Sequence, residues 1–176
     1  KENMSSVSVL GSGAWGTTMA QVLVDAGNSV QIWGRNANVV AEINATHTNS
    51  KFLPGVTLPK SLVGTTSIEQ AFQAEYLVVA IPSQSLRENL DNWREIFPKN
   101  KPVISTLKGI ELGTHLRMTE LIEKVLDIDS KNLGLITGPN LASELILRQP
   151  AGAVGASTNP HLADAISRLF KTKYFR

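Results

Sequence analysis

The sequence predicts an α/β fold in which a mainly parallel, doubly wound β-sheet carries helices on both faces. Short β-rich runs alternate with runs of helical periodicity along the chain, which is typical of parallel strands joined by crossover helices. Several of the β-rich runs are continuously apolar, as expected for strands that are buried on both faces. A length of 176 residues is ample for one such domain and short for two, so we predict a single domain over residues 1–176.

Six segments are predicted as strands. The first is short and apolar and ends at a glycine, and the second follows a helical run, so the first three elements form a βαβ unit. The predicted strands are residues 7–10, 29–33, 76–81, 102–107, 133–137 and 151–156.

Helical periodicity and capping residues predict the helices. The first helix follows the glycine-rich turn and ends at Gly27. Ser67 and Gln70 have the spacing of a capping box, and Asn159 stands before a proline at the first position of the last helix. Further helices are predicted over residues 36–44, 83–95, 114–126 and 140–147. Residues 46–64 contain two prolines and two glycines and are predicted to be a surface excursion beside the sheet.

The composition is that of a globular protein. Apolar residues make up 42% and charged residues 18%, and the formal net charge is +2 with 17 basic residues scattered along the chain. Because there is no basic block, we expect a phosphorylated small molecule rather than nucleic acid as the partner, and no insertion into a membrane. The chain has no cysteine, which excludes disulfides, and its three histidines lie too far apart for a metal motif. The opening KENMSS lacks an apolar signal-peptide core, so we expect a cytoplasmic protein.

A glycine-rich turn follows the first predicted strand. In VSVLGSGAWG, residues 7–16, the glycines Gly11, Gly13 and Gly16 leave a strand and open a helix. Gly11 permits the tight turn, Gly13 lets a pyrophosphate approach the backbone, and Gly16 lets helix and strand pack closely. Free N–H groups at the helix start would face the anion. The motif therefore predicts a Rossmann-type domain that binds a dinucleotide, with a purely structural turn as the alternative.

Two side chains near this turn bear on the cofactor. Trp15 lies at the helix start, where its ring would either flank the cofactor or pack on the core. Arg35 follows the second strand, where an acidic residue would bind the ribose 2′-hydroxyl of NAD and an arginine would bind the 2′-phosphate of NADP. Because QIWGRN at 31–36 contains no acidic residue, we predict a preference for NADP, with NAD also used. A solvated surface arginine is the alternative.

Three further stretches follow predicted strands, where open α/β sheets carry their chemistry. Pro82 and Ser83 leave the third strand, either as a capped helix start or as part of the nicotinamide side of the site. Lys108 ends the fourth and would project a cation toward a phosphate, carbonyl or alkoxide. Asn140 either caps the next helix or offers its amide to a substrate.

Six stretches occur together in one order: GSGAWGTTMA, QIWGR, NSKFLPGVTLP, AIPSQSLRE, STLKGIE and TGPNLASE. In this order they resemble the amino-terminal domain of bacterial NAD(P)-dependent glycerol-3-phosphate dehydrogenases. The resemblance runs from Val7 to Arg176, and the lysine and G-P-N blocks are its most specific parts. It implies hydride transfer between sn-glycerol 3-phosphate and dihydroxyacetone phosphate with NAD(P)H, a reaction that feeds glycerophospholipid synthesis.

The resemblance also implies roles for individual residues. Lys108 would contact both cofactor and substrate and is the candidate catalytic residue, and Gly138 and Asn140 would contact the substrate. Asn140 stands where many bacterial relatives have threonine, and Ala14 where serine is frequent; neither departure removes a charge. The cofactor would be bound by Gly11, Gly13, Ala14, Trp15, Gly16, Arg35, Pro82, Lys108 and Ala142.

Members of that family continue into a second, helical domain with the proton-accepting lysine and the groups that bind the substrate phosphate. The sequence ends at FKTKYFR, so we expect that domain to be absent from this chain. The chain alone should then be nearly inactive, because the substrate phosphate has few partners and water is not excluded. A homodimer is the expected assembly. The alternatives are another NADP-dependent reductase, acting on a keto or sugar acid, and an NADPH-sensing module without catalysis.

Overall fold

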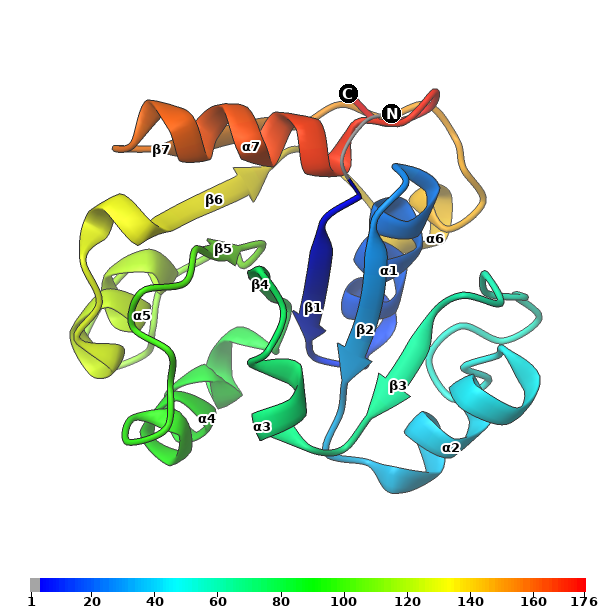
Figure 1. Ribbon diagram of the computed structural model, residues 1–176, viewed down its shortest axis with the longest axis horizontal. Coiled ribbons are helices and arrows are strands. Elements are labelled where there is room, and N and C mark those ends of the chain that lie inside the picture. The colour runs from blue at the N-terminus through cyan, green and yellow to red at the C-terminus, as the bar shows by residue number, and fades with distance from the viewer. Residues whose placement is uncertain (1–3) are drawn as a thin grey trace.

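A seven-stranded sheet forms the centre of the computed structural model, which describes residues 4–176 (Figure 1). The strand order is β3-β2-β1-β4-β5-β6-β7, and every neighbouring pair is parallel except the antiparallel pair β6 and β7. The first six strands have the order of a dinucleotide-binding doubly wound sheet, which confirms the predicted fold class. The strands are β1 (Ser6–Leu10), β2 (Ser29–Trp33), β3 (Val63–Thr65), β4 (Tyr76–Val79), β5 (Val103–Ser105), β6 (Leu133–Thr137) and β7 (Val154–Ser157).

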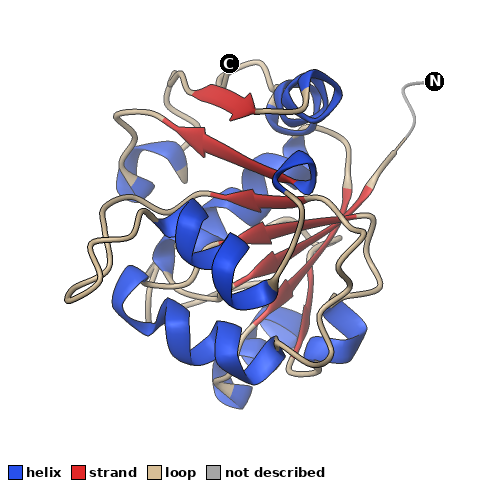
Figure 2. Ribbon diagram, turned by 90° about the vertical axis from the view of Figure 1, so that its left-hand side faces the viewer, coloured by secondary structure: helices blue, strands red, loops and turns tan. Residues whose placement is uncertain are grey.

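Helices lie on both sides of this sheet, as Figure 2 shows. None of the helices within residues 4–176 is long and apolar enough to span a membrane. The α-helices are α1 (Ala14–Asp25), α2 (Ala37–Thr46), α3 (Ile68–Ala71), α4 (Leu86–Trp93), α5 (Met118–Leu126), α6 (Ala142–Leu145) and α7 (Pro160–Phe170), and two 3-10 turns are η1 (Ser83–Ser85) and η2 (Ser130–Asn132).

The core consists of two apolar clusters, one on each face of the sheet. α1, α2, α6 and α7 pack on one cluster, which includes Met19 and Ile166, and α3, α4 and α5 pack on the other, which includes Leu90. Successive side chains of a strand point to opposite faces, so β1 contributes Val9 to the first cluster and Leu10 to the second. This burial on both faces explains why the strands read as apolar runs in the sequence.

The segment 46–64 differs from its prediction as a surface excursion. It buries Leu53, Leu58 and Leu62 against the sheet, and the side chain of Asn49 is also buried. Its last two residues begin β3, the edge strand next to β2. A strand of three residues is too short to show an apolar period, so the sequence pattern did not reveal it.

Several of the predicted elements start later than expected. The helix predicted from residue 83 begins as η1, and the one predicted from 114 begins at Met118, because residues 107–117 form a loop in which the Glu111 N–H donates to the Leu116 carbonyl. The strand predicted from 151 begins at Val154, since Ala151 instead forms a bridge with Phe175 near the chain end.

The predicted caps are largely confirmed. Ser67 accepts a hydrogen bond from the Gln70 N–H at 3.1 Å, although the reciprocal half of a capping box is replaced by a bond from the Ser67 N–H to Thr65 Oγ1. Asn159 accepts from the His161 N–H and starts α7 with Pro160 in its first turn.

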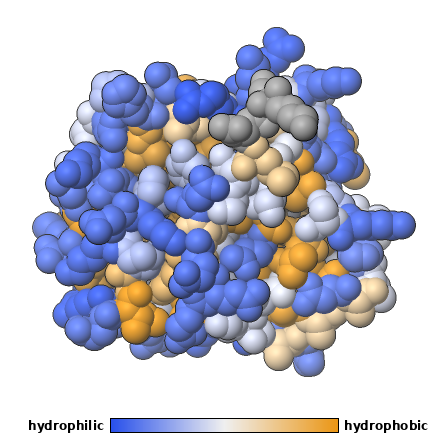
Figure 3. Space-filling model, viewed as in Figure 1, coloured by the Kyte–Doolittle hydropathy of each residue, from blue (hydrophilic) through white to orange (hydrophobic). Residues whose placement is uncertain are grey.

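Over the face seen in Figure 3, hydrophilic residues predominate and hydrophobic ones appear between them in separate groups.

Candidate functional site

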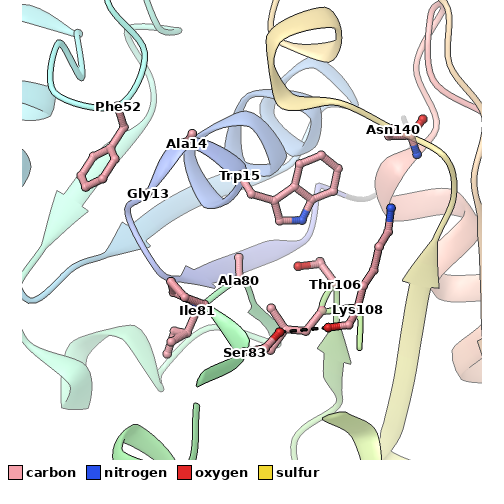
Figure 4. A pocket seen from close by; sticks show the side chains of 12 residues that line it. Gly13, Ala14, Trp15, Phe52, Ala80, Ile81, Ser83, Thr106, Lys108 and Asn140 are labelled. Carbon is pink, nitrogen blue, oxygen red and sulfur yellow. Dashed lines mark hydrogen bonds between the residues drawn. The ribbon is translucent and has the colours of Figure 1, made fainter. Parts of the chain in front are cut away.

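A cavity of about 440 Å³ lies at the carboxyl ends of β1, β4 and β5 (Figure 4). β1 and β4 are neighbours in the sheet although they are far apart in sequence, so this is the switch point of the strand order, where open α/β sheets bind ligands. The residues that line the cavity are Gly13, Ala14, Trp15, Phe52, Ala80, Ile81, Pro82, Ser83, Thr106, Leu107, Lys108 and Asn140.

The three glycines of the turn have two different roles. At two of the positions a side chain would collide with backbone, and at the third it would enter open space. Gly11 has a φ of +131°, and a Cβ there would lie 2.5 Å from the Ala80 carbonyl oxygen. A Cβ on Gly16 would lie 2.0 Å from the Gly11 carbonyl oxygen, so helix and turn touch through backbone. A Cβ on Gly13 would meet no atom within 4 Å. Two glycines therefore build the turn, and the third leaves room for a ligand to approach it.

The start of α1 is suited to an anion. Its N-cap residue is Gly13, which has no side chain to accept from the first N–H groups of the helix. The N–H groups of the first turn have no intrahelical acceptor, and the helix dipole is positive at this end. A pyrophosphate bound beside Gly13 would accept these hydrogen bonds.

The position of Trp15 agrees with both of its predicted roles, packing on the core and lining the cofactor site. Its ring packs on the edge of the first core cluster and also lines the cavity (Figure 4). The indole Nε1 is buried and has no hydrogen-bond partner among residues 4–176. Because this atom has no exposed surface, Trp15 meets the cavity through its ring rather than through its N–H.

Lys108 connects the ends of β5 and β6. Its Nζ donates to the Gly138 carbonyl oxygen at 2.6 Å, and its own carbonyl oxygen accepts from Ser83 Oγ at 2.9 Å. The side chain extends along the cavity toward Asn140 (Figure 4). The structure therefore brings Lys108, Gly138 and Asn140 together. These are the three residues that the family resemblance assigns to the substrate.

Asn140 does not cap α6, because the N-cap residue of that helix is Leu141. Instead its Nδ2 donates to the Gly152 carbonyl oxygen at 3.2 Å, and its N–H donates to the Gly138 carbonyl oxygen. These bonds keep the residue at the cavity wall. Of the two interpretations of Asn140, the capping role is wrong and the site role stays a prediction.

Besides Gly11 and Gly16, whose backbone builds the turn, two predicted cofactor residues lie outside the cavity wall. Ala142 is the first residue of α6. Arg35 follows β2, and its Nη2 lies 3.5 Å from Glu88 Oε1 on α4, with both side chains largely exposed. A guanidinium paired in this way is held only weakly, because exposed ion pairs contribute little, so an anionic group of a ligand could take the place of Glu88.

Sequence reasoning missed several lining residues. Phe52, which is 40% exposed, enters the cavity from the segment 46–64, and Thr106 follows β5 with its hydroxyl bonded to the Val79 carbonyl oxygen. Figure 4 shows Phe52 and Asn140 at opposite ends of the cavity, with Trp15 between them. Phe52 belongs to the stretch NSKFLPGVTLP of the resemblance, but no role was assigned to it, because its position depends on a chain segment that lies against the glycine-rich turn. Within residues 4–176, His, Asp and Glu side chains form no cluster of three or more that could hold a metal ion.

An ion pair holds the loop that carries Lys108. Arg87 of α4 donates through Nε and Nη2 to the two carboxylate oxygens of Glu111 at 2.7 and 2.8 Å. These hydrogen bonds, with a further one from the Thr114 hydroxyl, lower the pKa of Glu111 to about 2. Glu111 lies three residues after Lys108, so the pair anchors the loop to the helix that follows the cavity.

This ion pair predicts a pH dependence of stability. The folded-state pKa of Glu111 is below the unfolded value, so its contribution is complete above about pH 4.5 and is lost as the pH falls toward 2. Replacing Glu111 with glutamine should lower the free energy of unfolding at pH 7 and flatten its fall between pH 5 and 2. Urea unfolding across this range tests it, with the exposed Glu95→Gln as the matched control. A wild-type slope in Glu111→Gln would contradict the assignment.

Comparison with known proteins agrees with this geometry. Residues 6–163 match the family described as "NAD-dependent glycerol-3-phosphate dehydrogenase N-terminus". Glycerol-3-phosphate dehydrogenase [NAD(P)+] of Corynebacterium glutamicum (strain R) is 45% identical over 174 residues, which are 98% of this chain and 52% of that protein. The protein of the same name from Thermobifida fusca (strain YX) is also 45% identical, over 175 residues and the same shares.

Solved structures show the same fold. A glycerol-3-phosphate dehydrogenase from Coxiella burnetii has a TM-score of 0.87 at 23% identity, covering 98% of this chain and 53% of that one. The enzyme from Plasmodium falciparum has a TM-score of 0.87 at 24% identity, covering 99% and 52%. The chain spans about half the length of the curated relatives it matches. From the match over residues 6–163, this chain belongs to the family of NAD-dependent glycerol-3-phosphate dehydrogenase amino-terminal domains.

Proposed function

We propose that this chain is the dinucleotide-binding part of an enzyme that interconverts sn-glycerol 3-phosphate and dihydroxyacetone phosphate with NAD(P)H. The observation that carries the proposal is the cavity that joins the glycine-rich turn to Lys108 and Asn140. An anion-binding helix start and a lysine cation share this one space, as a dinucleotide and a phosphorylated substrate require. The names of the relatives support the same reaction and both cofactors.

The residues present fit a dinucleotide. The open space beside Gly13 and the uncapped N–H groups of α1 would take the pyrophosphate. The rings of Trp15 and Phe52 would lie against the remainder of the cofactor. Pro82 lines the same cavity on the β4 side. When bound, the nicotinamide supplies the hydride donor or acceptor.

Lys108 would act on the oxygen of the reacting carbon. Its ammonium has three donors and uses one on the Gly138 carbonyl, so two remain for cofactor and substrate. A positive charge there would stabilise the negative charge that develops on the carbonyl oxygen as hydride arrives. Asn140 would offer its amide to the same substrate. The general base that moves the hydroxyl proton is, by the family resemblance, a lysine of the second domain.

The proposal includes the setting of the enzyme. We propose a cytoplasmic protein whose product enters glycerophospholipid synthesis and that assembles as a homodimer. Exposed apolar side chains available to such an assembly include Leu112, Leu141, Leu147 and Val154. Analytical ultracentrifugation of the longest native form measures the assembly.

The deciding experiment is an equilibrium titration of this chain with NADPH and NADH, followed by the quenching of its tryptophan fluorescence. Saturable binding that Gly13→Ala weakens would support the proposed site. Binding to neither dinucleotide would contradict it. Turnover of dihydroxyacetone phosphate, measured with the complete native protein, then distinguishes an enzyme from a module that binds the dinucleotide without catalysis.

Arg35 predicts the ratio of the two affinities. A charge-assisted hydrogen bond to the 2′-phosphate contributes about 1.5–3 kcal/mol, so Arg35→Asp should lower the affinity for NADPH relative to NADH by about tenfold or more. The matched control is Arg94→Asp, which makes the same charge change at an arginine paired with Asp91. An unchanged NADPH/NADH ratio in Arg35→Asp would show that this arginine is only a surface residue.

A further inference from the structure

One fully buried polar side chain lies behind the glycine-rich turn. Asn49 has no exposed surface, although it belongs to the otherwise largely exposed stretch NSKF. Burial of an amide without partners is costly, so its contacts must compensate for the loss of water. None of the interpretations of the site described above uses this residue.

The amide of Asn49 is bonded to the turn itself. Its Nδ2 donates to the Ser12 carbonyl oxygen at 3.0 Å and to Thr17 Oγ1 at 2.9 Å. Its Oδ1 has no hydrogen-bond partner among residues 4–176, so the contacts use the donor half of the amide. Ser12 stands between Gly11 and Gly13, at the centre of the motif.

This contact fixes the direction of one peptide group. The peptide bond between Ser12 and Gly13 is planar, and its C=O and N–H point in opposite directions. Because Asn49 holds the Ser12 carbonyl oxygen on the buried side, the Gly13 N–H points the other way, and Gly13 itself is open, since a Cβ there would meet no atom within 4 Å. If this peptide rotated, a carbonyl oxygen would face the pyrophosphate and repel it.

The same residue also holds the turn that carries Phe52. The Asn49 carbonyl oxygen accepts from the N–H groups of Phe52 at 3.3 Å and Leu53 at 2.8 Å. On its outer side the turn is fixed by Glu42 of α2, whose carboxylate accepts from the N–H and the hydroxyl of Ser50. These contacts use the backbone of residue 49, and the side chain of Asn49 ties the same turn, with Phe52 at the cavity, to the glycine-rich turn.

We propose that Asn49 is a positioning residue of the dinucleotide site, which orients the Ser12–Gly13 peptide toward the pyrophosphate and holds Phe52 against the same ligand. The inference rests on the proposed function of the cavity as a dinucleotide site. It differs from the role of Arg35, because the pyrophosphate is common to NADPH and NADH. Loss of Asn49 should therefore weaken both cofactors equally.

The test compares Asn49→Ala with Asn44→Ala in this chain. Asn44 makes two amide hydrogen bonds of similar kind, to the carbonyl oxygen and N–H of Gly64, but does not line the cavity. Urea unfolding measures the stability of each variant, and titrations at 10 °C, where circular dichroism confirms folding, measure the dissociation constants for NADPH and NADH. Asn49→Asp is the second variant: it keeps the size of the side chain and replaces the amide donor with a carboxylate oxygen.

We expect Asn49→Ala to raise both dissociation constants by about tenfold with their ratio unchanged, and Asn44→Ala to change them by less than about twofold. Asn49→Asp should weaken both cofactors at least as much. Equal dissociation constants for Asn49→Ala and Asn44→Ala would reduce Asn49 to a structural role and overturn the inference. If the wild-type chain binds neither cofactor, the proposed site itself fails, and the inference fails with it.

Discussion

Replacing Lys108 with alanine is expected to lower the turnover of dihydroxyacetone phosphate by the longest native form of the protein by about 10²–10³-fold. The magnitude is that of removing one preorganised donor from a developing oxyanion. Lys108 is a cation that reaches the cavity wall between β5 and β6, and Ser83 fixes its backbone. The loss should fall on the rate of the chemical step more than on the affinity for the dinucleotide, because the pyrophosphate contacts lie at the other side of the cavity.

Steady-state kinetics of Lys108→Ala and Lys99→Ala measure this effect. Lys99 is an exposed lysine paired with Asp127, so its removal makes the same charge change away from the cavity. Thermal unfolding of the two variants should match the wild type closely. Turnover of Lys108→Ala within a few fold of the wild type would remove the lysine from the reaction and leave the cavity as a binding site alone.

The second large effect is expected for a pair of glycine substitutions in the same turn. Gly16→Ala should destabilise the chain by about 3 kcal/mol, because its Cβ would lie 2.0 Å from the Gly11 carbonyl oxygen and neither backbone can move freely. Gly13→Ala should change stability by less than about 1 kcal/mol, since its Cβ meets no atom within 4 Å. Gly13→Ala should nevertheless lower the affinity for both dinucleotides by about tenfold or more, because the methyl group occupies the approach of the pyrophosphate.

Urea unfolding and NADPH titration of the two variants separate the roles. The pair is its own control, since each variant adds one methyl group to the same turn. A Gly13→Ala chain that binds NADPH as the wild type does would mean that no ligand approaches the backbone there. A stable Gly16→Ala chain would mean that helix and turn separate at little cost.

Much of the fold could be predicted from the sequence. The limits of β2 and β6 agree with the predicted strands, because each is a five-residue stretch with three large apolar residues that lies between turn residues. Helix caps at Ser67 and Asn159 were also predictable, since an N-cap is a local interaction within four residues. The short edge strand β3 was not, because it forms by pairing with the distant β2. The late start of α5 was not either, because residues 107–117 form a loop that no period in the sequence reveals.

The site divides in the same way. The glycine-rich turn and Lys108 could be predicted because each directly follows a strand, and the ends of parallel strands meet at one edge of the sheet. Asn49, Glu111 and Phe52 could not be predicted. Asn49 bonds to Ser12, which is 37 residues away in the sequence, and Glu111 bonds to Arg87, which is 24 residues away. Phe52 lines the cavity from a segment that is distant in sequence from the glycine-rich turn. Asn140 illustrates the same limit. Asparagine before a helix is a frequent N-cap, but the side chain of Asn140 instead donates to the Gly152 carbonyl oxygen, twelve residues away.

The central position of β1 has a consequence for biosynthesis. Of the strands in residues 4–176, β1 is translated first, yet its two neighbours are β2, which ends at Trp33, and β4, which ends at Val79. Until synthesis has passed Val79, one edge of β1 therefore has no partner strand. Unpaired apolar edges are prone to association with other chains. The domain thus depends on timely translation of its first half, and slow codons between β2 and β4 would prolong the aggregation-prone stage.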